Sequence, residues 1–150
     1  MIIVSKTDPR TPQVVALLSQ HHALMESLFP AEDNFYLDVE ALCADHIHFY
    51  AAREGDVILG TGALAVFDTH AEVKSMFTAP AARNKGVGAA LLRQIEDTAR
   101  DIGTPALKLE TGDTLHAAQR LYTRHGFTAC PAFPPYESAG SSVFMEKSLT

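Results

Sequence analysis

Two glycines precede an amphipathic run in the segment Arg83-Asn84-Lys85-Gly86-Val87-Gly88, which we term the glycine loop. Apolar residues recur at helical spacing over residues 89–102, so the loop is predicted to lead into a helix. The first N–H groups of a helix lack partners within it, and together with the helix dipole they favour a bound phosphate, to which Arg83 and Lys85 add positive charge. The loop therefore predicts an anion site. Two glycines also suit an ordinary strand-to-helix turn, and their spacing fits both interpretations.

Two common phosphate-binding patterns do not fit the glycine loop. A P-loop requires Lys-Ser/Thr directly after its last glycine, whereas Gly86 is followed by Val87. A dinucleotide-binding fingerprint requires a third glycine where Leu91 stands. Neither of these two kinds of nucleotide site is indicated.

The glycine loop, preceded by a predicted strand over residues 72–79 and Pro80, resembles the Arg-x-x-Gly-x-Gly acetyl-CoA signature of the GCN5-related N-acetyltransferase (GNAT) superfamily. A second motif, Leu121-Tyr122-Thr123-Arg124-His125-Gly126-Phe127, is similar to the helix-and-strand motif that follows later in that family. The segments Leu109-Glu110-Thr111-Gly112 and Ser142-Val143-Phe144-Met145-Glu146-Lys147 resemble a branch of small bacterial members of the YsnE type.

The resemblance implies where acetyl-CoA would bind. In the family the pyrophosphate lies on the amides of the glycine loop, and the pantetheine arm runs along the fourth strand as an additional strand would. The thioester lies where the fourth and fifth strands splay apart, and a main-chain N–H near Met76 would polarise its carbonyl so that an amine attacks it directly. The implied cofactor-binding residues are Met76, Phe77, Thr78, Arg83, Asn84, Lys85, Gly86, Val87, Gly88 and Ala89.

The resemblance also implies two catalytic residues. Tyr122 matches the family tyrosine that donates a proton to the departing thiolate, although a tyrosine at a helix end can equally pack against Phe127. An alkylammonium acceptor has a pKa of about 10, so it must lose a proton before attack, and Glu72 matches a catalytic glutamate of GCN5-like members. The alternative role of Glu72 is an ion pair with Lys74 or Lys108.

Two positions leave the site incompletely assigned. Glu110, at the end of the predicted fifth strand, is a second candidate for the base. Many relatives carry a cofactor-contacting Asn where this chain has Leu115, and Asp113, Thr114 or His116 are the residues that could replace that contact.

The hydrophobic pattern predicts the elements that would position these residues. Apolar spacing of three and four predicts helices, alternation and β-branched runs predict strands, and the turn at 54–56 predicts a hairpin. The expected strands cover residues 2–5, 47–53, 57–67, 72–79, 106–110, 127–130 and 142–148, and the expected helices cover residues 12–29, 36–44, 89–102 and 114–125. This order predicts an α/β (α+β) fold, and the resemblance specifies it as the GNAT fold: a mixed, mostly antiparallel central sheet with helices on both faces and a splay between strands 4 and 5.

Composition limits the remaining possibilities. The chain has 150 residues, 47% of them apolar, and a net charge of −6, which suits one domain, residues 1–150, in the cytoplasm with neither nucleic acid nor membrane as a partner. Cys43 and Cys130 are expected to be separate, reduced, buried thiols. The His residues have no third ligand at metal-binding spacing, so no metal is expected.

The resulting functional hypothesis is an enzyme that transfers an acetyl group from acetyl-CoA to a primary amine of a small molecule. Two alternatives stay open: a protein or peptide amine as the acceptor, and a non-catalytic acyl-CoA-binding module. The oligomeric state is also open, with a homodimer as one expectation.

Overall fold

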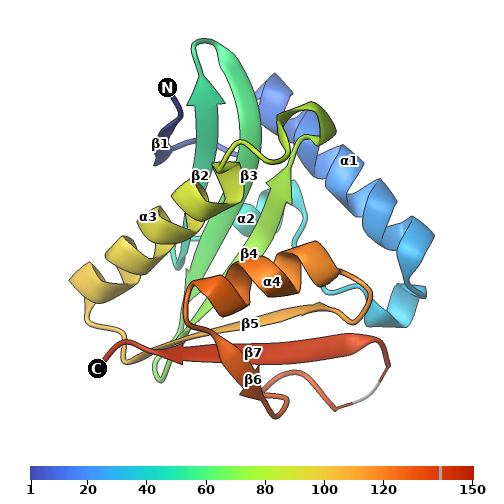
Figure 1. The fold of residues 1–150 in the computed structure, drawn as a ribbon, viewed down its shortest axis with the longest axis vertical. Helices are drawn as coiled ribbons and strands as arrows, with labels where there is room; N and C mark the ends of the chain where they lie inside the picture. Colours follow the sequence, from blue (N-terminus) through green and yellow to red (C-terminus); the bar gives the residue numbers. More distant parts are fainter. Residues whose placement is uncertain (139) are drawn as a thin grey trace.

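The computed structural model describes residues 1–138 and 140–150 (Figure 1). Strands and helices follow each other in the predicted order, with two additional short 3₁₀ turns. The elements are β1 (Ile3–Lys6), α1 (Pro12–Leu28), η1 (Ala31–Asp33), α2 (Val39–Leu42), β2 (Ile47–Glu54), β3 (Val57–Val66), β4 (Ala71–Thr78), η2 (Pro80–Ala82), α3 (Val87–Ile102), β5 (Ala106–Gly112), α4 (His116–Arg124), β6 (Thr128–Cys130) and β7 (Ser142–Ser148).

The strands form one seven-stranded sheet in the order β1-β2-β3-β4-β5-β7-β6. Every neighbouring pair is antiparallel except β4 and β5, which are parallel. Helix α3 packs on one face with Leu91, Leu92 and Ile95 fully buried, and α1 packs on the opposite face through Val14 and Leu18. The predicted mixed sheet with helices on both faces is confirmed.

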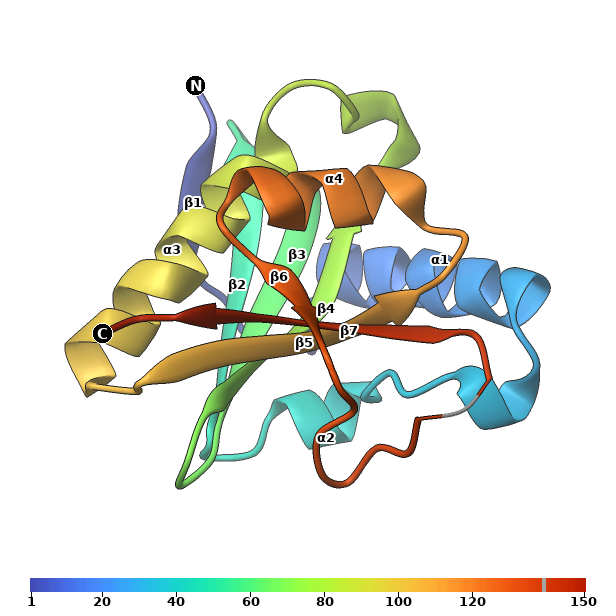
Figure 2. The same ribbon diagram turned by 60° about the horizontal axis from the view of Figure 1, so that its bottom comes forward.

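The sheet opens between β4 and β5. The two strands pair only from Ala71 opposite Leu107 to Val73 opposite Leu109, and their ribbons then diverge toward their carboxyl ends, with α4 alongside the gap (Figures 1 and 2). The predicted splay between the fourth and fifth strands is therefore present. Beyond Val73, the edge of β4 that faces β5 has no strand partner among the described residues.

A β-bulge bends β4 at the start of this gap. The β3–β4 register shifts between Thr61 and Ala63, so that Ser75 and Met76 lie opposite the single residue Gly62. Ser75 takes a left-handed conformation (φ 55°), and its carbonyl accepts a 2.8 Å hydrogen bond from the Thr61 hydroxyl. A Cβ atom on Gly62 would lie 2.7 Å from Sδ of Met76, so a larger residue here would displace the Met76 side chain.

Helix α1 contributes side chains both to the hydrophobic core and to the wall of a cleft. It begins at Pro12, as the proline at the first helical position predicts. The first half of its apolar stripe is buried in the core, whereas His21, Leu24 and Met25 line a cleft beside β4. Within residues 1–138 and 140–150 we find no helix with both the length and the apolar character needed to cross a bilayer.

Two local predictions were wrong. The expected helix over residues 36–44 is only one turn, Val39–Leu42, because the Asp38 side chain accepts from the Ala41 N–H and so starts the helix late. Cys43, expected to be buried, is exposed at the end of this turn, where its thiol bonds to the Val39 carbonyl oxygen. Cys130 is half-buried on the edge strand β6.

Candidate active site

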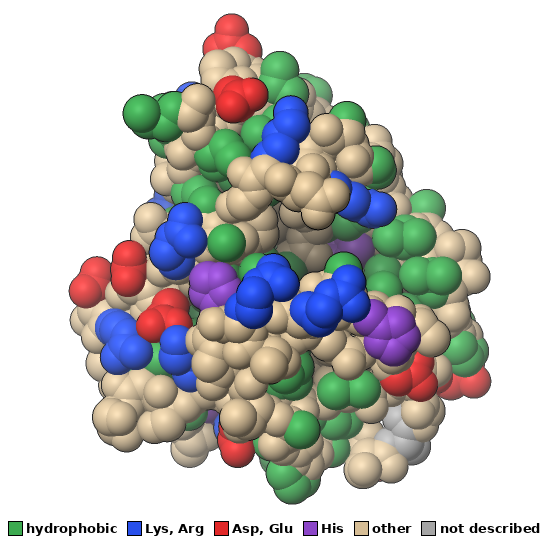
Figure 3. Space-filling view, viewed as in Figure 1, with side chains coloured by type: hydrophobic (Ala, Val, Ile, Leu, Met, Phe, Trp, Pro, Cys, Tyr) green, Lys and Arg blue, Asp and Glu red, His purple; other side chains and the backbone are tan. Residues whose placement is uncertain are grey.

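A cleft of about 860 Å³ lies at the splay. Its walls come from the second half of α1, the carboxyl-terminal half of β4, the glycine loop, the end of β5 and α4. On the face that carries α3 and α4 the surface is hollowed, and Lys and Arg side chains gather around the hollow (Figure 3). The basic rim favours an anionic ligand.

The glycine loop forms one end of the cleft. Asn84 (φ 64°) and Gly86 (φ 82°) both have left-handed conformations, and Gly86 caps the amino terminus of α3 without any side-chain cap. The first-turn amides, from Val87 to Ala89, therefore keep their N–H groups free of helical partners. All six predicted loop residues except Lys85 line the cleft, and Ala89 lines it as well.

Helix α4 lies directly against this loop. A Cβ atom on Gly88 would lie 3.0 Å from Cδ2 of Leu121, so the glycine allows close approach of the two segments. Leu115, Thr114 and His116 line the cleft near the start of α4, and Asp113 does not. Thr114 and His116 are thus better placed than Asp113 to replace the contact that Leu115 lacks.

The bulged part of β4 forms the floor of the cleft. Met76, Phe77 and Thr78, which are expected to contact the cofactor, all line it. The Ser75 hydroxyl is buried and has no hydrogen-bond partner among the described residues. Because a buried hydroxyl without a partner is costly, and because this edge of β4 is unpaired, the segment suits a ligand with amide groups that runs along the strand.

Tyr122 lies on α4 above the gap. It is 6% exposed, its ring packs edge-on against Phe127 at 5.8 Å, and it lines the cleft. Its hydroxyl makes no hydrogen bond within the described part of the chain, and burial, followed by the nearby charge of Glu110, raises its pKa above the ordinary value. The phenol therefore stays protonated and is available as a proton donor.

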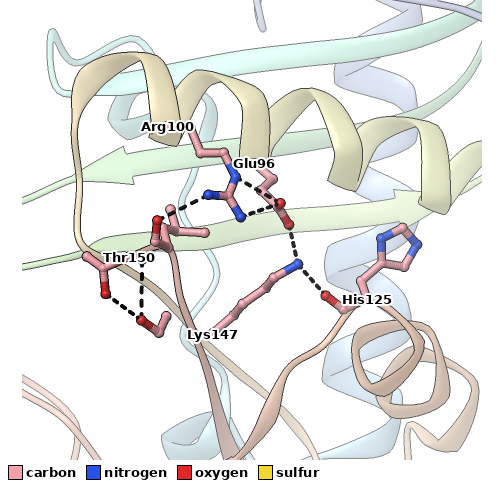
Figure 4. A network of polar contacts seen from close by, with 7 residues as sticks. Glu96, Arg100, His125, Lys147 and Thr150 are labelled. Atoms are coloured by element: carbon pink, nitrogen blue, oxygen red, sulfur yellow. Dashed lines mark hydrogen bonds and ion pairs between the residues drawn. The ribbon is translucent and has the colours of Figure 1, made fainter.

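An ion-pair network fixes the carboxyl-terminal end of α4 (Figure 4). The Lys147 ammonium group donates to Glu96 Oε1 and to the His125 carbonyl oxygen, each at 2.6 Å. Arg100 donates to the other Glu96 oxygen at 3.2 Å. Since Glu96 and Arg100 belong to α3 and Lys147 to β7, the network ties the Tyr122 helix to both neighbours.

Glu72 lies in a buried network at the other end of the cleft. It is 3% exposed, and its Oε2 accepts a 2.5 Å hydrogen bond from the Tyr136 hydroxyl. The Lys74 ammonium group lies 3.3 Å from the same oxygen and also donates to the Tyr136 hydroxyl and to the Phe35 carbonyl oxygen. The ion pair considered for Glu72 is present with Lys74, and because Glu72 also lines the cleft, its role as a base stays a prediction.

Glu110 faces the same cleft from the end of β5. Its Oε2 accepts a 2.8 Å hydrogen bond from the Ser142 hydroxyl, and Oε1 has no partner among the described residues. Burial raises the pKa of this carboxyl group; the Ser142 hydrogen bond and the charge of Lys74 oppose that rise. A carboxylate with a raised pKa and a free oxygen is a suitable proton acceptor.

Two residues of this end were not singled out as site residues from the sequence. Tyr136 comes from the proline-rich segment between β6 and β7, which the family fold places beside the acceptor cleft, but nothing in its spacing indicates that its hydroxyl reaches β4. His21 belongs to the apolar stripe of α1, but its ring stacks on Phe77 with centroids 5.0 Å apart and lines the cleft. Burial, reinforced by the positive charge of His22, lowers the pKa of His21 to about 4.

Comparison with known proteins links this geometry to one family. The profile of the Acetyltransferase (GNAT) family matches residues 16–127, which include the glycine loop and Tyr122. An IAA acetyltransferase of Azospirillum brasilense is 38% identical over 99% of this chain and 98% of its own length. YsnE of Bacillus subtilis strain 168, an uncharacterized N-acetyltransferase, is 39% identical over 91% of this chain and 93% of its own length.

A solved structure agrees along the whole chain. A candidate acyl-CoA N-acyltransferase from Klebsiella pneumoniae superimposes with a TM-score of 0.84 at 31% identity, covering 100% of this chain and 99% of the other. The similarity in sequence and in structure therefore includes every element that lines the cleft.

Proposed function

The chain belongs to the acetyltransferase (GNAT) family, and on that premise we propose that it transfers an acetyl group from acetyl-CoA to a primary amine of a small molecule. The observation that carries the proposal is one continuous cleft. It joins a loop of free helix amides, the Tyr122 hydroxyl and two carboxyl groups, the buried Glu72 and the half-buried Glu110. These are the groups that a direct acyl transfer from a phosphate-bearing thioester requires.

The glycine loop would hold the pyrophosphate of acetyl-CoA. Free amides of the first turn of α3, the helix dipole and the Arg83 side chain all favour a negative charge at that point. Lys85 does not line the cleft, and its proposed contribution is the positive charge it adds to the rim. The pantetheine arm would follow the unpaired edge of β4 from Thr78 toward Met76.

The acceptor would lose a proton to a carboxylate before it attacks the thioester carbonyl. We assign this role to Glu110, with Glu72 as the alternative, because Glu110 keeps a free oxygen and a raised pKa, whereas Glu72 is bound by Tyr136 and Lys74. The C–N bond forms, a main-chain N–H near Met76 stabilises the oxyanion, and the C–S bond then breaks. Tyr122 gives its proton to the sulfur, and the second nitrogen proton, lost as the amide forms, restores the Tyr122 hydroxyl, while the carboxyl group returns its proton to solvent.

The end of the cleft that holds Glu72 and Glu110, which we call the acceptor end, has features that favour a small acceptor. Asp33 accepts hydrogen bonds from the Ser141 N–H (3.1 Å) and hydroxyl (2.8 Å), which joins η1 to the segment before β7. Lys74 joins the segment after η1 to β4 through the Phe35 carbonyl oxygen. These ties hold three segments together on the side opposite the glycine loop, and we infer that they favour a small acceptor over a peptide chain.

The proposal is tested by mass spectrometry of co-purified ligands, followed by a thiol-release assay with acetyl-CoA. The acceptor panel should contain small primary amines and peptides with a free amino terminus or a lysine. Acetylation of small amines, lost in Tyr122→Phe, would support the proposal. Faster acetylation of peptides would favour the protein acceptor, and acetyl-CoA binding without any acetyl transfer would favour the non-catalytic module.

A further inference from the structure

The walls of the acceptor end are strongly apolar and partly exposed. Leu28 (47% exposed) and Phe35 (38% exposed) both line the cleft, together with Leu24 and Met25. Apolar side chains left accessible within a cleft indicate an apolar ligand, because a bound apolar group removes them from water. An apolar body on the acceptor would cover these side chains.

The exposed ring at this end belongs to a chain of aromatic contacts. Phe35 meets Tyr136 edge-on at 5.1 Å, Tyr136 meets Phe133 edge-on at 5.2 Å, and Phe133 meets Phe144 edge-on at 5.6 Å. Of these four rings, only Phe35 lines the cleft. A ligand ring beside Phe35 would continue this edge-to-face arrangement, which an aliphatic chain cannot do.

The charged side chains at the acceptor end favour a bound ammonium group and disfavour a bound carboxylate. Three carboxyl groups line it: Asp33, Glu72 and Glu110. The one cation among the described residues there is Lys74, and its ammonium group is already engaged by Glu72 and Tyr136 and by the Phe35 carbonyl oxygen. The arginines of the cleft, Arg83 and Arg124, lie on the glycine loop and at the end of α4. A carboxylate on the acceptor would meet the like charges of Asp33 and Glu110 and a Glu72–Lys74 pair that offers no free cation.

We propose that the acceptor is a primary amine with an aromatic body and without a carboxylate group. This inference rests on the proposed acetyl transfer and specifies its substrate class. The ammonium group would approach the free Oε1 of Glu110, and the ring would lie against Phe35 and the apolar side chains of α1. Free aromatic amino acids would be excluded by their carboxylate, and short alkylamines would leave the apolar wall uncovered.

Three matched acceptors separate the effect of the aromatic ring on kcat/KM from the effect of the carboxylate: 2-phenylethylamine, L-phenylalanine and ethylamine. L-phenylalaninamide serves as a control that keeps the α-substituent but removes the negative charge. With acetyl-CoA saturating, we expect kcat/KM for 2-phenylethylamine to exceed that for L-phenylalanine and for ethylamine by about 100-fold each. L-phenylalaninamide should recover most of the loss seen with L-phenylalanine.

Two variants test whether the preference for an aromatic amine depends on Phe35. Phe35→Ala should lower the ratio of kcat/KM for 2-phenylethylamine over ethylamine about tenfold. Phe67→Ala, which removes a ring of similar exposure (43%) outside the cleft, should leave that ratio unchanged. L-phenylalanine turned over as fast as 2-phenylethylamine, or a ratio to ethylamine near one, would overturn the inference while acetyl transfer itself stands. Bound acetyl-CoA without transfer to any of the four amines or to any member of the wider acceptor panel would overturn both proposals.

Discussion

The hydroxyl of Tyr136 donates a 2.5 Å hydrogen bond to Oε2 of Glu72, at the end of the cleft opposite the glycine loop. The same oxygen faces the Lys74 ammonium group at 3.3 Å. Oε2 of Glu72 is therefore already engaged by two partners, one hydroxyl and one ammonium group. Glu110 lies on the same cleft with one oxygen free. The two carboxyl groups therefore suit different tasks, and this difference can be measured.

Replacing Glu110 with Gln should remove the acidic limb of the pH profile. Burial raises the pKa of Glu110, so the wild-type kcat/KM should fall as the pH drops through that raised pKa and the carboxylate takes up a proton. Glu110→Gln should be about 10²-fold slower at neutral pH and recover toward the pKa of the amine, at about 10. If Glu110→Gln keeps the wild-type profile and Glu72→Gln loses the limb, the base is Glu72.

The buried Glu72–Lys74 pair should matter for stability. Glu72→Gln leaves the Lys74 ammonium group, whose side chain is only 11% exposed, without its counter-charge. We expect the free energy of unfolding in urea to fall by about 3 kcal/mol, and the double variant Glu72→Gln/Lys74→Met to recover most of it. Asp8→Asn, which breaks an exposed ion pair with Arg10, is the control and should have little effect. Equal losses in the single and double variants would refute the pairing.

His21 should make the fold sensitive to acid. Its pKa is lowered to about 4, so between pH 6.5 and 4 the unfolded chain binds a proton that the folded chain does not. Stability is therefore full above pH 6.5 and is lost as the pH falls toward 4, by roughly 3 kcal/mol in all. His21→Phe should flatten this part of the pH dependence of unfolding, whereas a substitution of the exposed His46, His46→Gln, should not. A His21→Phe variant as acid-labile as the wild type would contradict the assignment.

Tyr122→Phe isolates the proton donor. Removing the hydroxyl should lower kcat by about 10² or more and leave the affinity for acetyl-CoA nearly unchanged, because a thiolate leaving into a buried cleft needs a proton. Tyr50→Phe is a matched control, since Tyr50 is also buried but its hydroxyl bonds to Thr98, away from the cleft. Equal chemistry-limited rates for wild type and Tyr122→Phe would leave Tyr122 with packing as its only role.

Gly86→Asp tests the glycine loop. The residue has a φ of 82° and open space around its Cβ position, so a side chain there would be strained and would place a negative charge beside the free amides. Calorimetry should detect no acetyl-CoA binding. Gly103→Asp carries a similar strain (φ 87°, open space) at the opposite end of α3 and should still bind. Unchanged affinity in a folded Gly86→Asp protein would exclude the loop as the cofactor site.

Much of the fold could be predicted because the signals are local. Pro12 begins α1, Gly103 ends α3 in a left-handed conformation, and the turn after Glu54 joins two β-rich runs, all as expected. The one-turn length of α2 was missed because a capping side chain, Asp38, outweighed the apolar spacing over residues 36–44.

The site was only partly predictable because it depends on contacts between distant segments. The resemblance to a family located the glycine loop and Tyr122 on the sequence. It could not give the bulge at Ser75, which arises from pairing with β3, or the bond between Tyr136 and Glu72, which spans 64 residues. The apolar stripe of α1 also does not reveal that its second half, from His21 onward, faces a cleft and not the core.

Initial rates with both substrates varied test the central claim most directly. In one assay, the released thiol and the N-acetylated amine are quantified at several concentrations of acetyl-CoA and 2-phenylethylamine, and the intact mass of the protein is recorded. Direct transfer within a ternary complex predicts equal amounts of thiol and amide, intersecting double-reciprocal lines and an unmodified protein. Parallel lines with an acetylated protein, or thiol release without any amide, would contradict it.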